Sequence, residues 1–111
     1  MKAVCADKKF KIILNTQELP KDNPDRLIDI YKISKTAITA RADMLKSSTG
    51  KEGINADLED CIVMCRAIQD LNSKTGFKAA GGIKTLESAV TYYLLAKLTF
   101  GNNLCMDNFR I

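Results

Sequence analysis

The sequence contains no histidine, and its four cysteines include no CxxC pair. A zinc site built from cysteine and histidine is therefore not expected, and we expect no metal. Cys61 and Cys65 lie one helical turn apart on an apolar stretch, which predicts small buried side chains. Cys5 and Cys105 have no secretory context that would favour disulfides. We assign no role to any of the four.

Long apolar runs are also missing. The longest, such as KIIL and YYLLA, are far too short to cross a bilayer, and the opening MKAVCADKK has no apolar core for a signal peptide. We therefore expect a cytoplasmic protein with no membrane contact. The net charge is +4, but the lysines are spread along the chain. That distribution favours small anionic ligands, or solubility alone, over a nucleic-acid surface.

The composition is otherwise that of a folded protein. The 111 residues are 46% hydrophobic and 27% charged, which is ordinary for a globular chain and argues against disorder. No low-complexity segment or long linker interrupts the sequence. We expect one domain over residues 1–111, or part of one.

Short apolar runs alternate with segments of helical periodicity. The run FKIILN predicts a strand, and Asn23 followed by Pro24 predicts the start of a helix that continues to about Ala40. The same alternation then continues to the end of the chain. It predicts a strand over 43–47, a helix capped by Asn55, a strand over 75–80, a helix from Thr85 to Phe100 ended by Gly101, and the start of a strand at 108–111. Strands that alternate with helices pair in parallel, so the predicted fold is α/β.

The helix after Asn55 has the clearest apolar face. Its apolar residues recur at helical spacing and are Leu58, Cys61, Ile62, Cys65, Ile68 and Leu71.

Two lysines fall at the ends of neighbouring predicted strands. Lys46 follows the second strand and Lys78 the third, and the two are 32 residues apart, close to one βαβ unit. Ligands of α/β folds bind at the carboxyl ends of the strands. Neighbouring cations disfavour each other's charge, which favours a neutral amine on one of them. A neutral amine can attack a carbonyl to form a Schiff base, while the second lysine supplies charge or moves protons.

The loops after these strands suit a phosphate group. Thr49, Gly50 and Lys51 follow Lys46, and Gly81 and Gly82 follow Lys78. Glycines let backbone N–H groups approach an anion, so the expected ligand is a small phosphorylated carbonyl compound. The alternative is that both lysines are ordinary surface charges and that the loops only turn the chain.

Three segments carry a family resemblance over nearly the whole chain. MLKSSTGKEGINA and GFKAAGGIKTLESA, with KIILNTQEL upstream, resemble the C-terminal part of deoxyribose-phosphate aldolase, a class I aldolase with a TIM-barrel fold. The resemblance implies that Lys46 is the Schiff-base lysine and that Lys78 perturbs it. It implies a phosphate site at Thr49, Gly50, Lys51, Gly81 and Gly82. It also implies reversible cleavage of 2-deoxyribose 5-phosphate to acetaldehyde and glyceraldehyde 3-phosphate, without a metal or organic cofactor.

The chain departs from that family in sequence and in extent. Ser47 and Ala79 stand where threonine and proline are expected, and Arg41 replaces a glycine, at a cost in stability if its φ is positive. A TIM barrel needs eight strands and about 250 residues, so we expect a half barrel that is cut at both ends. Such a half would expose strand edges and an apolar inner face. Three alternatives follow: the catalytic-lysine half of an aldolase, a non-catalytic module that binds phosphorylated sugars, or a self-associating scaffold. A homo-oligomer or a companion chain would complete the barrel.

Overall fold

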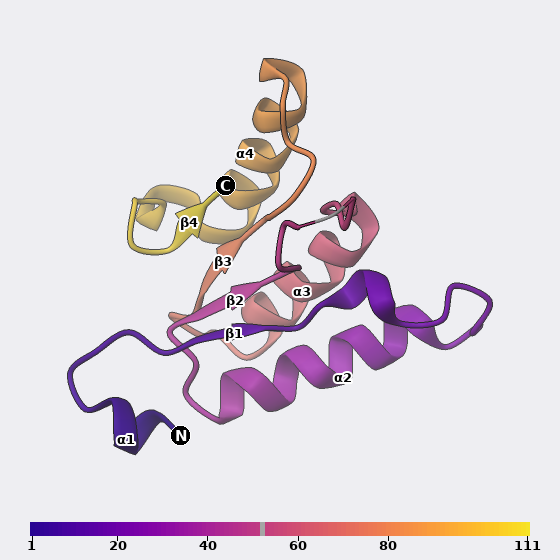
Figure 1. Ribbon diagram of the computed structural model, residues 1–111. Coiled ribbons are helices and arrows are strands. Elements are labelled where there is room, and N and C mark those ends of the chain that lie inside the picture. The colour runs from indigo at the N-terminus through magenta and orange to yellow at the C-terminus, as the bar shows by residue number, and fades with distance from the viewer. Residues whose placement is uncertain (52) are drawn as a thin grey trace.

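The computed structural model describes residues 1–51 and 53–111, in which helices and short strands alternate (Figure 1). The elements are α1 (Lys2–Cys5), β1 (Lys11–Ile13), the 3-10 turn η1 (Thr16–Glu18), α2 (Arg26–Thr39), β2 (Met44–Lys46), α3 (Leu58–Asp70), β3 (Gly76–Lys78), α4 (Leu86–Phe100), the 3-10 turn η2 (Gly101–Asn103) and β4 (Phe109–Arg110). Every strand and helix predicted from the sequence is present. None of the described helices is both long enough and apolar enough to pass through a bilayer.

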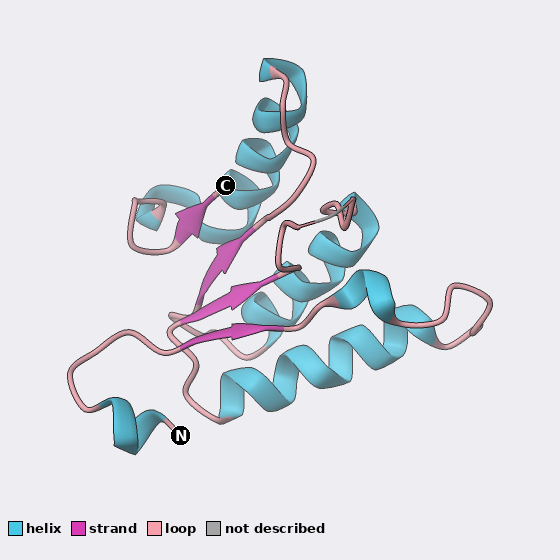
Figure 2. Cartoon of the chain, in the orientation of Figure 1, coloured by secondary structure: helices cyan, strands magenta, loops and turns pink. Residues whose placement is uncertain are grey.

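The four strands form one parallel sheet in the order β1-β2-β3-β4 (Figure 2). Each strand therefore lies beside its neighbour in sequence, and each of the three crossovers between the described strands contains a helix, α2, α3 or α4. Such crossovers are right-handed, which places the helices on one face of the sheet. The prediction of an α/β fold with parallel strands is confirmed.

The core lies between the sheet and the helices. Leu45 and Phe77 are register partners at the centre of the sheet, and both are completely buried. They pack in a cluster with residues of α2 and α3, among them Ile30, Met64 and Ile68. Side chains alternate along a strand, so the residues on either side of Leu45 and Phe77 point to the opposite face.

That opposite face differs from the apolar surface expected of a half barrel. It carries Ile13, which is 44% exposed, but also four basic side chains. These are Lys11, Lys46, Lys78 and Arg110, one from each strand. Leu45 and Phe77 face the helices, and the opposite face carries these four cations together with the apolar Ile13 and Met44.

Two helix starts differ from the prediction. The first helix begins at Arg26 rather than Pro24, and the side chain of Asn23 accepts a hydrogen bond from Asp25 N–H at 3.0 Å in the turn before it. The next helix is capped by Asp57, whose carboxylate accepts from Asp60 N–H at 3.2 Å. Asn55 is therefore not the cap. Its carbon atoms instead lie close to Gly81 and Gly82 of the following loop.

The start of the last helix and two helix ends agree with the sequence. The Thr85 hydroxyl accepts from Ser88 N–H at 3.1 Å, and Gly101 ends α4 with a φ of 57°. Arg41 follows α2 with a φ of 65°, the positive value at which a side chain is costly.

The predicted apolar face of α3 is only partly buried. Cys61, Cys65 and Ile68 lie in the core, whereas Leu58, Ile62 and Leu71 are 39 to 48% exposed. The exposed Leu58 and Ile62 line a groove of about 430 Å³ between α3 and α4. The helix therefore turns one flank to the sheet and the other to this groove.

The cysteines divide between the core and the surface. Cys61 and Cys65 are buried as predicted, and burial raises the pKa of Cys65 to about 12, which keeps its thiol protonated. Cys5 is half-buried and Cys105 is exposed. All four thiols are free.

Candidate active site

Lys46 and Lys78 are direct register partners at the ends of β2 and β3. Neighbouring strands of a sheet lie about 4.8 Å apart, and partners in a parallel pair point to the same face. The structure therefore brings together the two lysines that lie 32 residues apart in the chain. Both are half-buried.

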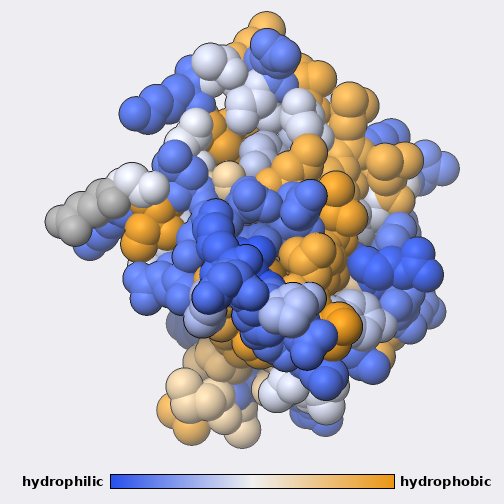
Figure 3. Space-filling view, turned by 90° about the vertical axis from the view of Figure 1, so that its right-hand side faces the viewer, coloured by the Kyte–Doolittle hydropathy of each residue, from blue (hydrophilic) through white to orange (hydrophobic). Residues whose placement is uncertain are grey.

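The two lysines belong to a row of register partners that crosses all four strands, with one residue from each strand. Ile13 pairs with Lys46, and Arg110 pairs with Lys78. The Lys46 ammonium Nζ donates to the Thr49 carbonyl at 3.4 Å, which turns it toward the loop after β2. Lys78 and Arg110 line an open hollow of about 390 Å³ with residues of the C-terminal segment. Figure 3 looks toward the carboxyl ends of the strands, where hydrophilic side chains lie beside an apolar band.

The glycines of the two loops are in close contact. A Cβ on Gly50 would lie 3.6 Å from the Gly81 nitrogen, so the loops after β2 and β3 touch. A Cβ on Gly81 would lie 2.2 Å from the Ile54 carbonyl oxygen, and one on Gly82 would lie 2.5 Å from Asn55 Cγ. All three glycines have a positive φ, between 72° and 98°. Only glycine satisfies both the conformation and the space at positions 81 and 82.

The other two residues expected around a phosphate lie on the surface. Thr49 and Lys51 are exposed, and the Thr49 hydroxyl accepts from Lys51 N–H at 3.4 Å. The structure thus gathers the threonine, the basic residue and the glycines into one loop pair.

The hydrogen bonding of Ala79 fits the departure at this position, where the family resemblance leads us to expect proline. Its N–H donates to the Arg110 carbonyl at 3.2 Å, which extends the β3–β4 pairing past Lys78. Proline has no N–H and could not make this bond.

An ion pair at the same end of the sheet was not predicted. The Arg26 guanidinium donates to both carboxylate oxygens of Asp60, at 2.5 and 2.7 Å, and to the Thr16 carbonyl at 2.9 Å. Gln17 donates a further bond to Asp60 at 2.8 Å. This cluster joins the loop after β1 to the first turns of α2 and α3. The only sequence signal is an acidic residue next to Cys61 on the buried side of a helix.

The Asp60 carboxyl is fully buried and remains ionised. Burial raises its pKa, but the hydrogen bonds from Arg26 and Gln17 outweigh burial and lower the pKa below its ordinary value. Arg26 responds in the opposite sense, since its bond to Asp60 raises its pKa. The Arg26–Asp60 ion pair therefore has a structural role, since its charges are largely buried and bind each other.

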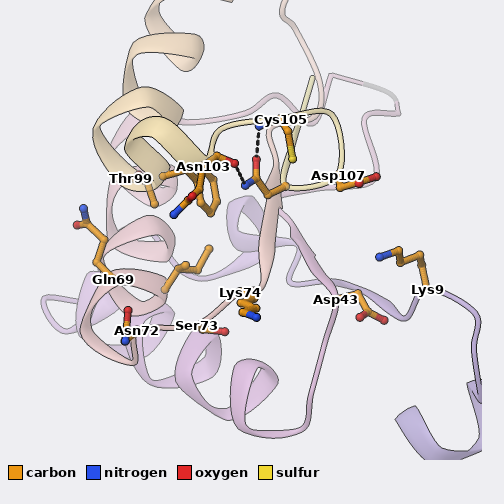
Figure 4. Close-up of a pocket in the computed structure, with 13 residues that line it drawn as sticks. Lys9, Asp43, Gln69, Asn72, Ser73, Lys74, Thr99, Asn103, Cys105 and Asp107 are labelled. Atoms are coloured by element: carbon orange, nitrogen blue, oxygen red, sulfur yellow. Dashed lines mark hydrogen bonds between the residues drawn. The ribbon is translucent and has the colours of Figure 1, made fainter.

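A larger cavity lies at the other end of the sheet. It has a volume of about 690 Å³, and its lining includes Lys9, Asp43, Lys74 and Asn108, each just before a strand (Figure 4). This cavity is therefore remote from the two lysines. Its lining mixes charges of both signs with amides and indicates no single ligand.

Comparison with known proteins bears on this arrangement. The family model for DeoC/LacD family aldolases matches residues 1–102. The chain belongs to this aldolase family. It is 43% identical over 107 residues to deoxyribose-phosphate aldolase of Agrobacterium fabrum and 41% identical over 112 residues to that of Mus musculus. These alignments cover 96% of the chain but only 39% and 34% of the relatives, so the chain spans about a third of their length.

Solved structures agree on the fold of this family member. A crystal structure from Toxoplasma gondii, provisionally assigned as a deoxyribose-phosphate aldolase, superposes with a TM-score of 0.81 at 20% identity and covers 98% of the chain and 43% of that protein. A similarly assigned structure from Coccidioides immitis gives 0.67 at 33% identity, over 85% of the chain and 35% of that protein. The expected fold class, part of an aldolase α/β barrel, is confirmed.

Proposed function

We propose that this chain carries the Schiff-base half of a class I aldolase that reversibly cleaves 2-deoxyribose 5-phosphate to acetaldehyde and glyceraldehyde 3-phosphate. The observation that supports it is the pairing of Lys46 with Lys78 on adjacent strands. Lys46 is the nucleophile. Lys78 is the next cation along the row, and Arg110 follows Lys78.

The proposed chemistry begins with the amine of Lys46 and uses water in its first and last steps. The Lys46 amine attacks the aldehyde carbon of the open-chain sugar, and loss of water gives an iminium. The bond between the second and third carbons breaks, its electrons move toward the iminium nitrogen, and the third-carbon hydroxyl loses its proton to release glyceraldehyde 3-phosphate. The remaining enamine takes a proton on carbon, and water releases acetaldehyde. Lys78 is placed to carry protons in these steps.

The loop pair would hold the phosphate of that sugar. Thr49, Gly50, Lys51, Gly81 and Gly82 offer a hydroxyl, an ammonium group and glycine N–H groups in one place. The ligand is then anchored at its phosphate end while its aldehyde reaches the lysines. The reaction takes place in the cytoplasm in this proposal.

The remaining strands of the barrel belong to the proposal as well. Residues 1–111 form one partial-barrel domain, in which β1 and β4 each have one strand partner. The relatives are about three times longer, so we infer that further strands, from a companion chain or from a second copy, complete the site.

The test is reductive trapping of the imine. The chain is incubated with acetaldehyde and borohydride and digested, and each lysine is examined for an added ethyl group. Ethylation should concentrate on Lys46, and Lys46→Ala should abolish both this adduct and any carbon–carbon bond cleavage. Lys11→Ala is the matched control, since Lys11 lies on the same sheet face but outside the row, and it should leave trapping unchanged. Even labelling of all lysines, or unchanged turnover in Lys46→Ala, would remove the mechanism.

A second function has one observation in its favour. The five residues proposed to hold the phosphate are all among the described residues, whereas the sheet has two open edges. A non-catalytic module that binds phosphorylated sugars would need only the loops. It predicts stabilisation by inorganic phosphate without imine trapping, and a self-associating scaffold predicts a concentration-dependent dimer with neither.

A further inference from the structure

Two serines that take no part in the proposed chemistry lie directly after Lys46. Ser47 is 1% exposed and Ser48 is completely buried. Burying a hydroxyl costs free energy unless the hydroxyl forms a hydrogen bond, so both side chains are expected to have hydrogen-bond partners.

Both hydroxyls bind the main chain of one residue, Ala80. Ala80 N–H donates to Ser47 Oγ at 3.0 Å, and Ser48 Oγ donates to the Ala80 carbonyl at 2.6 Å. Ser48 lies two residues after Lys46, and Ala80 lies two residues after Lys78. The two side chains therefore join the chain just past one lysine to the chain just past the other.

These bonds continue the sheet beyond its last main-chain contact. Ser47 N–H donates to the Lys78 carbonyl at 3.1 Å, which is the end of the regular β2–β3 pairing. The next acceptor in a parallel ladder would be the Ser47 carbonyl. That carbonyl instead accepts from Thr16 N–H at 3.0 Å, on the side of β1. The Ser47 hydroxyl takes its place as the acceptor for Ala80.

The joined segment also carries the glycine loop. Ala80 precedes Gly81, whose carbonyl accepts from Ala56 N–H at 2.9 Å and whose α-carbon leaves no room for a side chain. A shift of Ala80 would move Gly81 against the Ile54 carbonyl. The position of the two lysines and the position of the glycines are thus coupled through Ala80.

We propose that Ser47 and Ser48 are positioning residues, which hold Lys46 at a fixed distance from Lys78 and fix the glycine loop relative to both. The effect on chemistry rests on the proposed function. The two hydroxyl bonds to Ala80, called the serine clamp below, can be measured separately. Neither serine touches the substrate in this proposal. Each acts through Ala80.

The first experiment removes one hydroxyl at a time and follows imine trapping. In Ser48→Ala the ratio of ethylation at Lys46 to ethylation at Lys11 should fall about tenfold, because small misplacements of reacting groups are costly. Labelling of Lys11 itself should stay the same, a selectivity that lower stability alone would not produce. Ser47→Ala should act in the same direction, and Ser47→Thr, which keeps the hydroxyl, should restore the ratio.

Ser34→Ala is the matched control. Ser34 is completely buried and donates to the Ile30 carbonyl at 2.7 Å, within α2. Its replacement removes a hydroxyl of equal burial far from the loops and should leave the labelling ratio unchanged. All variants are compared at a temperature where circular dichroism shows them folded.

Hydrogen exchange separates the clamp from the chemistry. The Ala80 amide should be protected in the parent chain and should exchange faster in Ser47→Ala, whether or not an imine forms. If the parent labels Lys46 selectively and Ser48→Ala keeps the same ratio of labelling, the clamp is refuted and the aldolase proposal stands. If the parent shows no selective labelling, the aldolase proposal fails, and an Ala80 amide that exchanges freely in the parent refutes the clamp as well.

Discussion

The buried carboxylate of Asp60 is the single side chain on which three segments depend. It accepts two bonds from Arg26 and one from Gln17, while its own N–H closes the cap of α3. Removing one partner of a buried ion pair leaves the other charge without compensation. The loop after β1 would then lose its bond to α3 and keep, to α2, only the bond from Arg26 to the Thr16 carbonyl.

Asp60→Asn should therefore lower the free energy of unfolding by about 3–5 kcal/mol. Urea denaturation followed by circular dichroism measures it. Glu59→Gln is the control, because Glu59 lies in the same helical turn but is exposed, and it should change stability by less than about 0.5 kcal/mol. Equal effects of the two changes would show that the ion pair adds little.

The same pair predicts how stability depends on acidity. The pKa of Asp60 is lower in the folded chain than its unfolded value of about 3.9. A depressed carboxyl pKa stabilises the fold above the unfolded pKa, and this contribution is lost as the pH falls from about 4 through the folded pKa. Asp60→Asn should thus show a weaker loss of stability in that acid range than the parent.

At the scale of elements, the end of α2 shows strain. The Arg41 and Ala42 N–H groups donate to the Ile38 and Ala37 carbonyls at 2.9 and 3.2 Å, which is the Schellman pattern with Arg41 in the left-handed position. Glycine should be better there, so Arg41→Gly should raise the unfolding free energy by about 1 kcal/mol. Arg41→Ala keeps the Cβ and should give no such gain. A loss of stability in Arg41→Gly would mean that the side chain makes a compensating contact.

The glycine loop after β3 allows a sharper comparison. Gly81 and Gly53 both have a positive φ, but a Cβ would strike the Ile54 carbonyl only at Gly81, and none of the described atoms outside its chain neighbours lies within 4 Å of one at Gly53. Gly53→Ala thus measures the conformational cost alone. Gly81→Ala should cost about 1–3 kcal/mol more in unfolding free energy, because the backbone must also move. Equal losses of unfolding free energy in the two variants would show that the loop at Ile54 moves to accept the added Cβ at little cost.

The elements themselves were predictable because their signals are local. The β-branched run at β1, the Thr85 cap and Gly101 each act within a few residues, and the structure agrees with all three. Asn55 was misassigned for the opposite reason. Its side chain lies against Gly82, a contact 27 residues away that no local pattern reveals. The roles of Ser47, Ser48 and Asp60 were missed in the same way, since their partners lie far along the chain.

At the scale of the molecule, the pairing of the lysines was predictable and the character of their sheet face was not. Equal spacing after successive strands was enough to place Lys46 beside Lys78. The uncovered face of the sheet was expected to be apolar. Because side chains alternate along each strand, Leu45 and Phe77 instead point toward the helices, and basic side chains lie on the opposite face. The sequence contains this alternation, although only the register shows that Arg110 extends the same row.

This row of like charges should make stability depend on salt. Two unit charges 4 Å apart repel by about 1 kcal/mol even in water, and added salt screens exposed charges. Raising KCl should therefore increase the unfolding free energy measured in urea. Arg110→Gln removes the charge at the open end of the row while its main-chain bond to Ala79 remains. It should stabilise the chain by a few tenths of a kcal/mol at low salt and weaken the response to KCl.

Lys84→Gln provides the control for that experiment, since Lys84 is an exposed lysine in the loop before α4 and outside the row. It makes the same change in net charge, so a general effect of net charge would appear equally in both variants. A response confined to Arg110→Gln would show that repulsion is concentrated on the uncovered sheet face. A segment that supplies carboxylates would then bind that face favourably. Equal responses to KCl in the two variants would show that charge on this face does not favour completion of the barrel.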